Sequence, residues 1–232
     1  MPFYAIPYGG YSINSTAGTA NIQAIYDYLK PYGYTKEAVA GICGNAAWES
    51  GLNPWRWQGN QVNYNAGYGL FQFTPASGYI PGCSSLPDYA PNLSVSEQTP
   101  GADPNDARCQ LYVFASNYLG KWISNCWNYR DWDPADFPTL YDLRNHILTT
   151  YGSGNSLSMA QFMTIRDVPS ATFAFLGCFE RAATPATYET YRLPYAQQCY
   201  DILQAYDPTP RQNLFLVLKV LDNQQKRKFN NI

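Results

Sequence analysis

Apolar residues recur at helical spacing along most of the chain, which predicts a mostly α-helical protein. The first helix is expected to start at about residue 21 and to end where Pro31 and Gly33 interrupt the pattern. A second helix is expected to begin after Thr35, whose side chain suits an N-cap. It should end at about Ser50, because Gly51 can adopt the left-handed conformation that commonly follows a helix.

The second half of the chain shows the same periodicity. It predicts helices over residues 105–122, 159–166 (with Ser158 as its cap) and 169–182, and a further helix that begins at Pro185. Pro194 falls inside this last helix and should kink it, because proline lacks the N–H that an inner helical position donates.

A strand-like pattern lies between the second and third helices. Residues 68–74 alternate as the two faces of a strand do, and the turn-forming residues 65–67 precede them. We therefore expect an α+β fold that is mostly α, with a small β-hairpin beside the second helix. The alternation would place Tyr68, Gln72 and Thr74 on one face of this hairpin.

Composition divides the chain into three parts. Residues 1–20 are rich in Gly, Ser, Thr and Tyr and predict an extended N-terminal arm, whereas residues 21–206 predict one domain. Residues 207–232 form a basic and apolar tail. Such a tail could bind a partner or a membrane surface, or it could pack as a last helix on its own domain.

Charge and residue counts exclude several classes of function. The net charge of −2 gives the chain no overall nucleic-acid-binding character. No stretch of about eighteen apolar residues predicts a membrane span, and residues 1–11 lack the pattern of a signal peptide. The single histidine, His146, cannot supply the two or more imidazole ligands of a zinc peptidase or zinc amidase.

The last turn of the second helix carries the most informative residue, Glu49. The apolar side chains of this helix form one stripe, and Glu49 lies at the edge of that stripe. Partial burial and the carbonyl end of the helix dipole both disfavour the charged form of a carboxyl group there. A general acid for glycoside cleavage needs such a protonated group near neutral pH. The alternative is a glutamate at a frayed helix end that bonds a loop amide.

Residues 38–54, which read AVAGICGNAAWESGLNP, resemble the catalytic helix of the phage tail lysozymes. Those proteins are similar to the goose-type lysozymes and the soluble lytic transglycosylases, and the Gly-x-x-Gln hairpin of these families resembles residues 67–74, GYGLFQFT. Near the end of the domain, residues 179–182 read FERA and are followed by Pro185, which resembles a further tail-lysozyme segment. The ordered motifs extend over residues 20–206.

The resemblance implies a lysozyme-like fold and a glycosidase that cleaves peptidoglycan between N-acetylmuramic acid and N-acetylglucosamine. Glu49 would be the general acid that protonates the glycosidic oxygen. Tyr68, Gln72 and Thr74 would line the substrate cleft, and Trp57 could stack on a sugar ring. No metal and no organic cofactor is implied.

The family also implies a place in a phage particle. Delivery in the virion, or into the periplasm or the surroundings of the cell, would suit a chain in which we see no signal peptide. The expected partners are bacterial peptidoglycan and, through residues 207–232, other tail or virion proteins. The main alternative is a catalytically silent virion component or glycan-binding module, because a fold does not by itself establish an activity.

A second catalytic carboxylate is hard to find in the sequence. No Asp or Glu occurs between Ser50 and Pro87, although retaining and inverting glycosidases both use a second carboxylate. Glu49 could act alone, as acid and then base, and give the anhydro-sugar product of a lytic transglycosylase; we favour this single-carboxylate site. We expect Glu180, beside Arg181, to be a buried and hydrogen-bonded structural charge. The more distant acids that could instead activate water are Asp88, Glu97, Asp103, Asp106 and Glu180.

The cysteines suggest one further rival. A cysteine peptidase or amidase would have to pair Cys43 with His146, but nucleophilic cysteines generally lie at helix N-termini and Cys43 falls in mid-helix. Cys83 and Cys109 flank a loop and are the better candidates for a disulfide. Free and buried thiols are expected at the cysteines within helical patterns, which are Cys43, Cys178 and Cys199.

Overall fold

The computed structural model describes residues 3–6, 13–94, 105–125, 135–182 and 185–208. Its α-helices are α1 (Thr16–Leu29), α2 (Lys36–Ser50), α3 (Ala76–Tyr79), α4 (Asn105–Ala115), α5 (Pro138–Thr150), α6 (Met159–Phe162), α7 (Val168–Phe175) and α8 (Leu193–Tyr206). Short 3₁₀ turns occur at η1 (Lys30–Tyr32) and η2 (Gln58–Asn60), and π-helical turns at η3 (Leu176–Glu180) and η4 (Tyr188–Arg192). The expected tail lies outside the described residues, apart from its first two.

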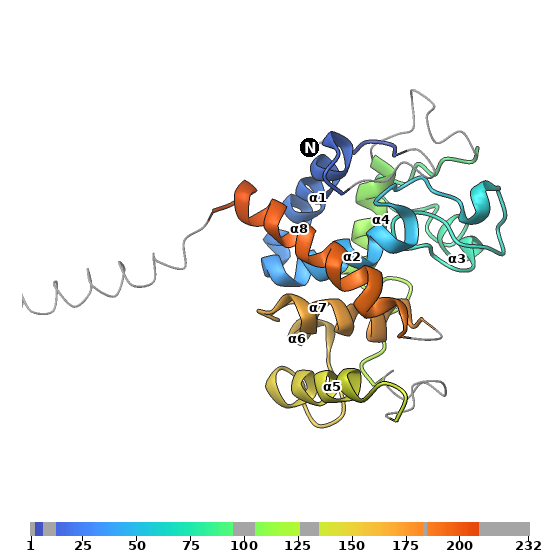
Figure 1. The fold of residues 1–232 in the computed structure, drawn as a ribbon. Coiled ribbons are helices and arrows are strands. Elements are labelled where there is room, and N and C mark those ends of the chain that lie inside the picture. The colour runs from blue at the N-terminus through green and yellow to red at the C-terminus, as the bar shows by residue number, and fades with distance from the viewer. Residues whose placement is uncertain (1–2, 7–12, 95–104, 126–134, 183–184, 209–232) are drawn as a thin grey trace, which may run out of the picture.

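Helix α2 occupies the middle of the domain. Figure 1 shows α1 and α8 on one side of it and α7, with α5 and α6 beyond, on the other. Two glycines let the neighbouring helices approach: a Cβ at Gly41 would come within 2.7 Å of the backbone of Ala171 in α7. A Cβ at Gly44 would come within 2.5 Å of Ala196 in α8. These contacts are far shorter than packed carbon atoms allow, so both positions need glycine.

The ends of α2 confirm the sequence prediction. The Thr35 hydroxyl accepts a hydrogen bond from the Ala38 N–H at 3.1 Å, and Gly51 follows the helix with φ 63°. Helix α1 begins earlier than expected, at Thr16, because Ser15 caps it by accepting from the Gly18 N–H. The described start of the arm packs on the domain, where Ile6 is buried.

The β-hairpin expected at residues 68–74 is not formed as a pair of strands. In the described chain this region contains only isolated bridges, from Tyr68 to Trp57 and from Tyr68 to Phe73. The chain reverses within residues 69–72, where Gly69 has φ 84° and Gln72 has φ 44°. The alternating pattern therefore belongs to the two short arms of one tight turn rather than to one face of a strand.

Helix α4 ends at Ala115, earlier than expected, and α5 was not predicted, whereas α6, α7 and α8 lie close to their expected places. Two of the helical segments include π-helical turns. Asp167 caps α7, and the helix continues into η3, which ends at Arg181 with φ 53°. The turn η4 leads directly into α8, where Pro194 occupies the first turn. A proline ring clashes with the carbonyl four residues before it in a regular helix, so the wider turn of η4 accommodates Pro194.

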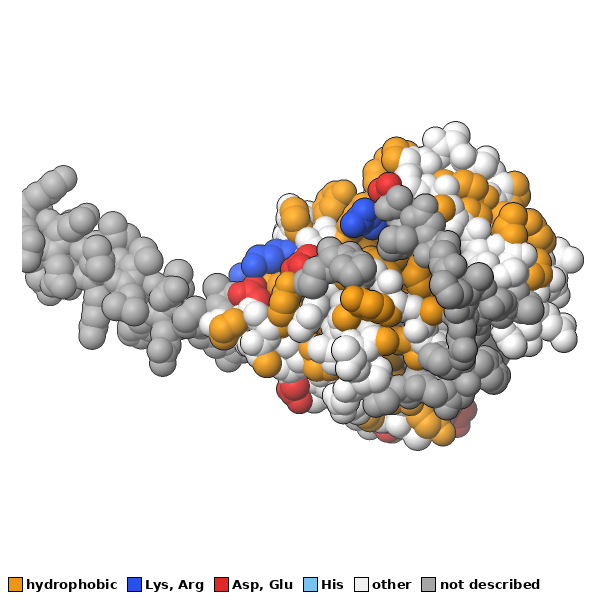
Figure 2. Space-filling model, turned by 90° about the horizontal axis from the view of Figure 1, so that it is seen from above, with side chains coloured by type: hydrophobic (Ala, Val, Ile, Leu, Met, Phe, Trp, Pro, Cys, Tyr) orange, Lys and Arg blue, Asp and Glu red, His pale blue; other side chains and the backbone are white. Residues whose placement is uncertain are grey.

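The described cysteines are free and buried, which confirms the expectation for the three in helices. The disulfide considered between Cys83 and Cys109 is not formed. None of the helices in the described part of the chain has the length and apolar character needed to span a bilayer. Figure 2 shows a face that carries few charged side chains among apolar and uncharged polar ones.

Candidate active site

A cavity of about 710 Å³ opens between the end of α2, the turn at residues 69–72 and the turn η3. Four of its eleven lining residues are charged, whereas charged residues make up 14% of the chain. This concentration of charge in a hollow is typical of a site that binds or converts a polar ligand. The lining consists of Glu49, Gln58, Phe71, Gln72, Phe73, Thr74, Lys121, Phe179, Glu180, Arg181 and Ala182.

Glu49 is held at the rim of this cavity by a buried arginine. The Arg192 Nη2 atom donates to Glu49 Oε1 at 2.5 Å, and the two side chains are 3% and 24% exposed, respectively. Helix α2 brings Glu49 to the cavity because Gly51 ends the helix one residue beyond Ser50. Glu49 is therefore an anchored carboxyl group and not a glutamate of a frayed helix end.

Arg192 is itself fixed by two further hydrogen bonds. Its Nη1 atom donates to Asn45 Oδ1 at 2.8 Å, and its Nε atom donates to Thr187 Oγ1 at 3.1 Å. Asn45 is fully buried and donates to the carbonyl oxygens of Gly41 and Thr172. The planar guanidinium thus joins α2 to η4, with its donors in fixed directions. Sequence reasoning missed this role, although an arginine among the inward positions of the last helix was a signal for it.

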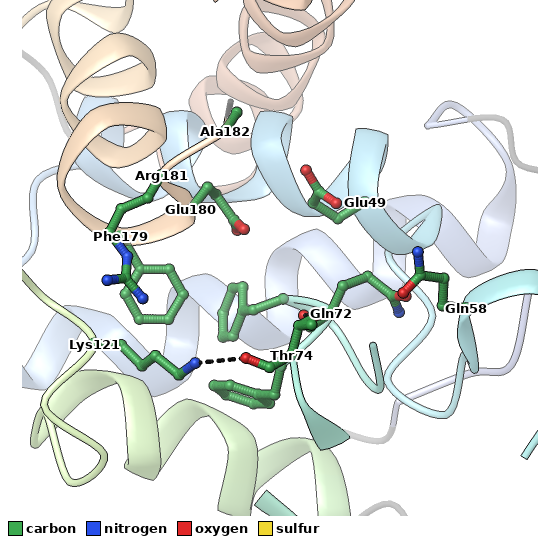
Figure 3. A pocket seen from close by; sticks show the side chains of 11 residues that line it. Glu49, Gln58, Gln72, Thr74, Lys121, Phe179, Glu180, Arg181 and Ala182 are labelled. Carbon is green, nitrogen blue, oxygen red and sulfur yellow. Dashed lines mark hydrogen bonds between the residues drawn. The ribbon is translucent and has the colours of Figure 1, made fainter. Parts of the chain in front are cut away.

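Glu180 faces the same cavity from η3. Its Oε1 atom is buried and has no hydrogen-bond partner in the described structure. Burial, followed by the charge of Glu49, raises the pKa of Glu180 well above its ordinary value, while Arg192 and Lys121 act in the opposite direction. The expectation of a buried and hydrogen-bonded structural charge is therefore wrong. Glu180 as a whole is half-buried, its Oε1 atom is unbonded, and the side chain lines the cavity beside Glu49, as Figure 3 shows.

Gln72 and Thr74 form part of the wall opposite Glu49. The Gln72 Nε2 atom donates to the carbonyl oxygens of Arg56, at 3.1 Å, and Gly69, at 3.0 Å. Both amide hydrogens are therefore engaged, and Oε1 is the polar atom left for a ligand. The Thr74 hydroxyl donates to the Gln72 carbonyl at 2.9 Å and tightens the turn.

Tyr68 and Trp57 lie behind this wall rather than in it. Tyr68 is fully buried, its hydroxyl donates to Asp106 Oδ2 at 3.0 Å, and it accepts from the Asn92 N–H at 2.8 Å. Trp57 is 1% exposed, and its Nε1 atom donates to the Asn92 carbonyl at 2.9 Å. Neither side chain lines the cavity, in contrast to the expected contacts with the glycan. Both support the turn that carries Gln72.

Asp106 is the centre of this supporting network. Tyr79 donates to its Oδ1 atom at 2.6 Å, and Gln110 donates to its Oδ2 atom at 2.7 Å. Gln110 also accepts from the Leu70 N–H at 2.7 Å, which connects Asp106 to the turn. Burial raises the pKa of Asp106 to about 6, although the hydrogen bonds to its carboxylate act in the opposite direction.

The raised pKa of Asp106 predicts a pH-dependent stability. Between the unfolded pKa of about 3.9 and the folded value of about 6, the folded protein binds more protons. This proton binding stabilises the folded protein. The stabilisation is complete below the unfolded pKa and is lost as the pH rises through the folded pKa. We expect its loss to lower the free energy of unfolding by about 2 kcal/mol between pH 4 and pH 7.

Asp106→Asn should remove this part of the pH dependence. Denaturant unfolding at both pH values measures it, with the exposed Asp142→Asn as the matched control. The same decrease in Asp106→Asn and in the unmodified protein would contradict the role given to this carboxyl group.

Cys43 and His146 do not form the site that the alternative of a cysteine peptidase requires. Cys43 is fully buried on α2 and hydrogen-bonds Cys199, whereas His146 is exposed on α5. A nucleophile and its base must lie within hydrogen-bonding reach of each other.

The comparisons with known proteins agree with this geometry. A family model described as phage tail lysozyme matches residues 20–203. Morphogenesis protein 1 of Bacillus phage B103 is 46% identical over 63 residues, a stretch that covers 27% of this chain and 17% of that protein. The chain thus matches a minor part of that relative. The family match covers well over half of the chain and confirms the resemblance inferred from the sequence. The chain belongs to the phage tail lysozyme family.

Proposed function

We propose that the protein is a peptidoglycan-degrading glycosidase of a phage tail, which cleaves the glycan strand between N-acetylmuramic acid and N-acetylglucosamine. One observation carries the proposal: buried Arg192 anchors Glu49 at the rim of a cavity whose opposite wall contains Gln72. Membership of the phage tail lysozyme family supports this substrate class. Local opening of the cell wall during infection is the role that this activity serves.

Glu49 donates a proton to the glycosidic oxygen, so that the bond between this oxygen and the sugar C1 atom breaks. The neighbouring Glu180 makes a proton available. Burial, followed by the charge of Glu49, raises the pKa of Glu180. Glu180 therefore keeps its proton above the pH at which an isolated glutamate loses its own, and it can supply that proton to Glu49.

Two products are chemically available after the bond breaks. Water that attacks C1 and gives its proton to a carboxylate yields a reducing sugar. Attack by the sugar's own 6-hydroxyl yields an anhydro-sugar, which is lighter by one water molecule. Glu180 is the second carboxyl group among the cavity-lining residues, and its place supports the hydrolytic route.

Mass spectrometry of digested peptidoglycan tests the proposal. The wild-type protein should release disaccharide peptides from purified sacculi, and the mass of the muramic acid end identifies the reducing or the anhydro product. Sacculi of several wall types should be used, with folding verified by circular dichroism. Absence of release from all of them would overturn the proposal.

Glu180→Gln should change the pH profile of the reaction. A glutamine has no acidic proton, so the proton that Glu180 retains at higher pH because of its raised pKa is no longer available to Glu49. We expect the alkaline limb of kcat/KM to move to lower pH by about one unit. The exposed Glu189→Gln on η4 is the matched control. An unchanged pH profile in Glu180→Gln would mean that Glu180 does not supply a proton for the reaction.

One observation favours a second candidate function. The relative from Bacillus phage B103 is named a morphogenesis protein, which describes assembly of the particle. A lysozyme-like virion component that binds glycan without cleaving it would be consistent with that name. Glycan binding without product release by the wild-type protein would establish this alternative.

A further inference from the structure

Two cationic side chains from separate segments meet on one wall of the cavity. Lys121 comes from the connection after α4, and Arg181 is the first residue after η3. Figure 3 shows them beside each other, next to the Phe179 ring and on the side away from Glu49. Neither cation has a carboxylate within ion-pair distance among the described residues.

Hydrogen bonds fix the side chain of Lys121 and the main chain of Arg181. The Lys121 Nζ atom donates to the Thr74 carbonyl at 2.9 Å, which ties it to the turn opposite Glu49. Arg181 has φ 53°, and its N–H donates to the Leu176 carbonyl at 2.8 Å, closing η3. A left-handed conformation is unfavourable for a residue with a side chain, so the surrounding structure must maintain it.

This arrangement leaves the cavity with uncompensated positive charge. Glu49 is already paired with Arg192, and Glu180 lies in surroundings that favour its neutral form. Burial and the nearby Arg181 lower the pKa of Lys121, while Glu180 acts in the opposite direction. A bound anion would relieve the repulsion between the two cations.

We propose that Lys121 and Arg181 form a subsite for a carboxylate group of the substrate. The inference rests on the proposed function, because it assigns this subsite to the glycan that Glu49 cleaves. Peptidoglycan offers two carboxylate sources. One is the stem peptide, and the other is the lactyl group of muramic acid in strands from which the peptide has been removed. Oligomers of N-acetylglucosamine alone offer neither.

Calorimetric binding in a Glu49→Gln background, which suppresses turnover, tests the subsite. The ligands are chitotetraose, a peptide-free tetrasaccharide with two muramic acids, and the same tetrasaccharide with its stem peptides. A carboxylate-bearing ligand should bind roughly tenfold more tightly than chitotetraose at low salt, and this preference should shrink as salt is added. Tighter binding of the peptide-free tetrasaccharide would identify the lactyl carboxylate as the group that the subsite binds. Tighter binding of the tetrasaccharide with stem peptides would identify a carboxylate of the stem peptide.

Adding Lys121→Gln and Arg181→Gln should abolish the preference and leave the affinity for chitotetraose unchanged. Unchanged affinity for chitotetraose would show that the turn at Thr74 is intact in the double variant. Arg166→Gln, at an exposed position outside the cavity, is the matched control and should keep the preference. Equal affinities for neutral and charged ligands, or a preference that survives the double substitution, would overturn the subsite.

The two proposals fail in different ways. Release of disaccharide peptides by a protein without any carboxylate preference would refute the subsite alone. A carboxylate preference in a protein that releases no product would refute the glycosidase and retain the subsite.

Discussion

Glu49→Gln should lower the rate of muropeptide release about a thousandfold, because a glutamine cannot donate the proton that the leaving oxygen requires. The fold should persist, since the glutamine side-chain oxygen can still accept the hydrogen bond from Arg192. Release of disaccharide peptides from purified sacculi measures the effect, and circular dichroism verifies the fold.

The exposed Glu189 provides the matched control, because Glu189→Gln makes the same chemical change outside the cavity. It should leave the rate within a factor of about two, as surface substitutions generally have small effects. If Glu49→Gln were as active as this control, Glu49 would not be the acid, and the catalytic assignment would be wrong.

Arg192→Met should have the largest effect on stability. It removes the partner of a partly buried carboxylate and leaves Asn45 Oδ1 without the Arg192 donor. Removing one member of a buried ion pair costs about 3–5 kcal/mol in the free energy of unfolding. Denaturant unfolding measures this value. A midpoint equal to that of the wild-type protein would contradict the central role of the guanidinium.

Arg192→Lys separates charge from geometry. A lysine keeps the positive charge but lacks the planar fork that joins Glu49, Asn45 and Thr187. We expect it to recover part of the stability and to remain well below the wild-type rate of muropeptide release. Full recovery of the rate would mean that positive charge alone suffices and that the position of Glu49 is set by other contacts.

Local signals explain why the sequence predicted α2 so well. The Thr35 cap and Gly51 lie at the two ends of the helix, and together they set the place of Glu49. The expected apolar stripe was too narrow, because residues 38–47 are buried on every side of α2. The prediction of a hairpin failed for a related reason. An alternation over seven residues fits one strand or the two arms of a turn, and only the positive φ angles of Gly69 and Gln72 distinguish them.

The remaining parts of the site depend on contacts that are distant in sequence. Arg192 reaches Glu49 across 143 positions, and the pairing depends on how α8 packs on α2. Tyr68 was expected in the cleft because the motif contains it, but its hydroxyl bonds Asp106 on α4 instead. Glu180 reaches the cavity through the π-helical turn η3, which helical periodicity does not predict.

The two glycines of α2 determine which wall of the cavity can move. At Gly41 and Gly44 the backbone of α2 touches α7 and α8 so closely that the three helices form one stiff block. Glu180 follows α7 and Arg192 precedes α8, so the carboxyl groups and the guanidinium keep their spacing as long as this block is intact. If the cavity widens around a bulky glycan, we therefore expect the opposite wall to move, which contains Gln72 and Thr74.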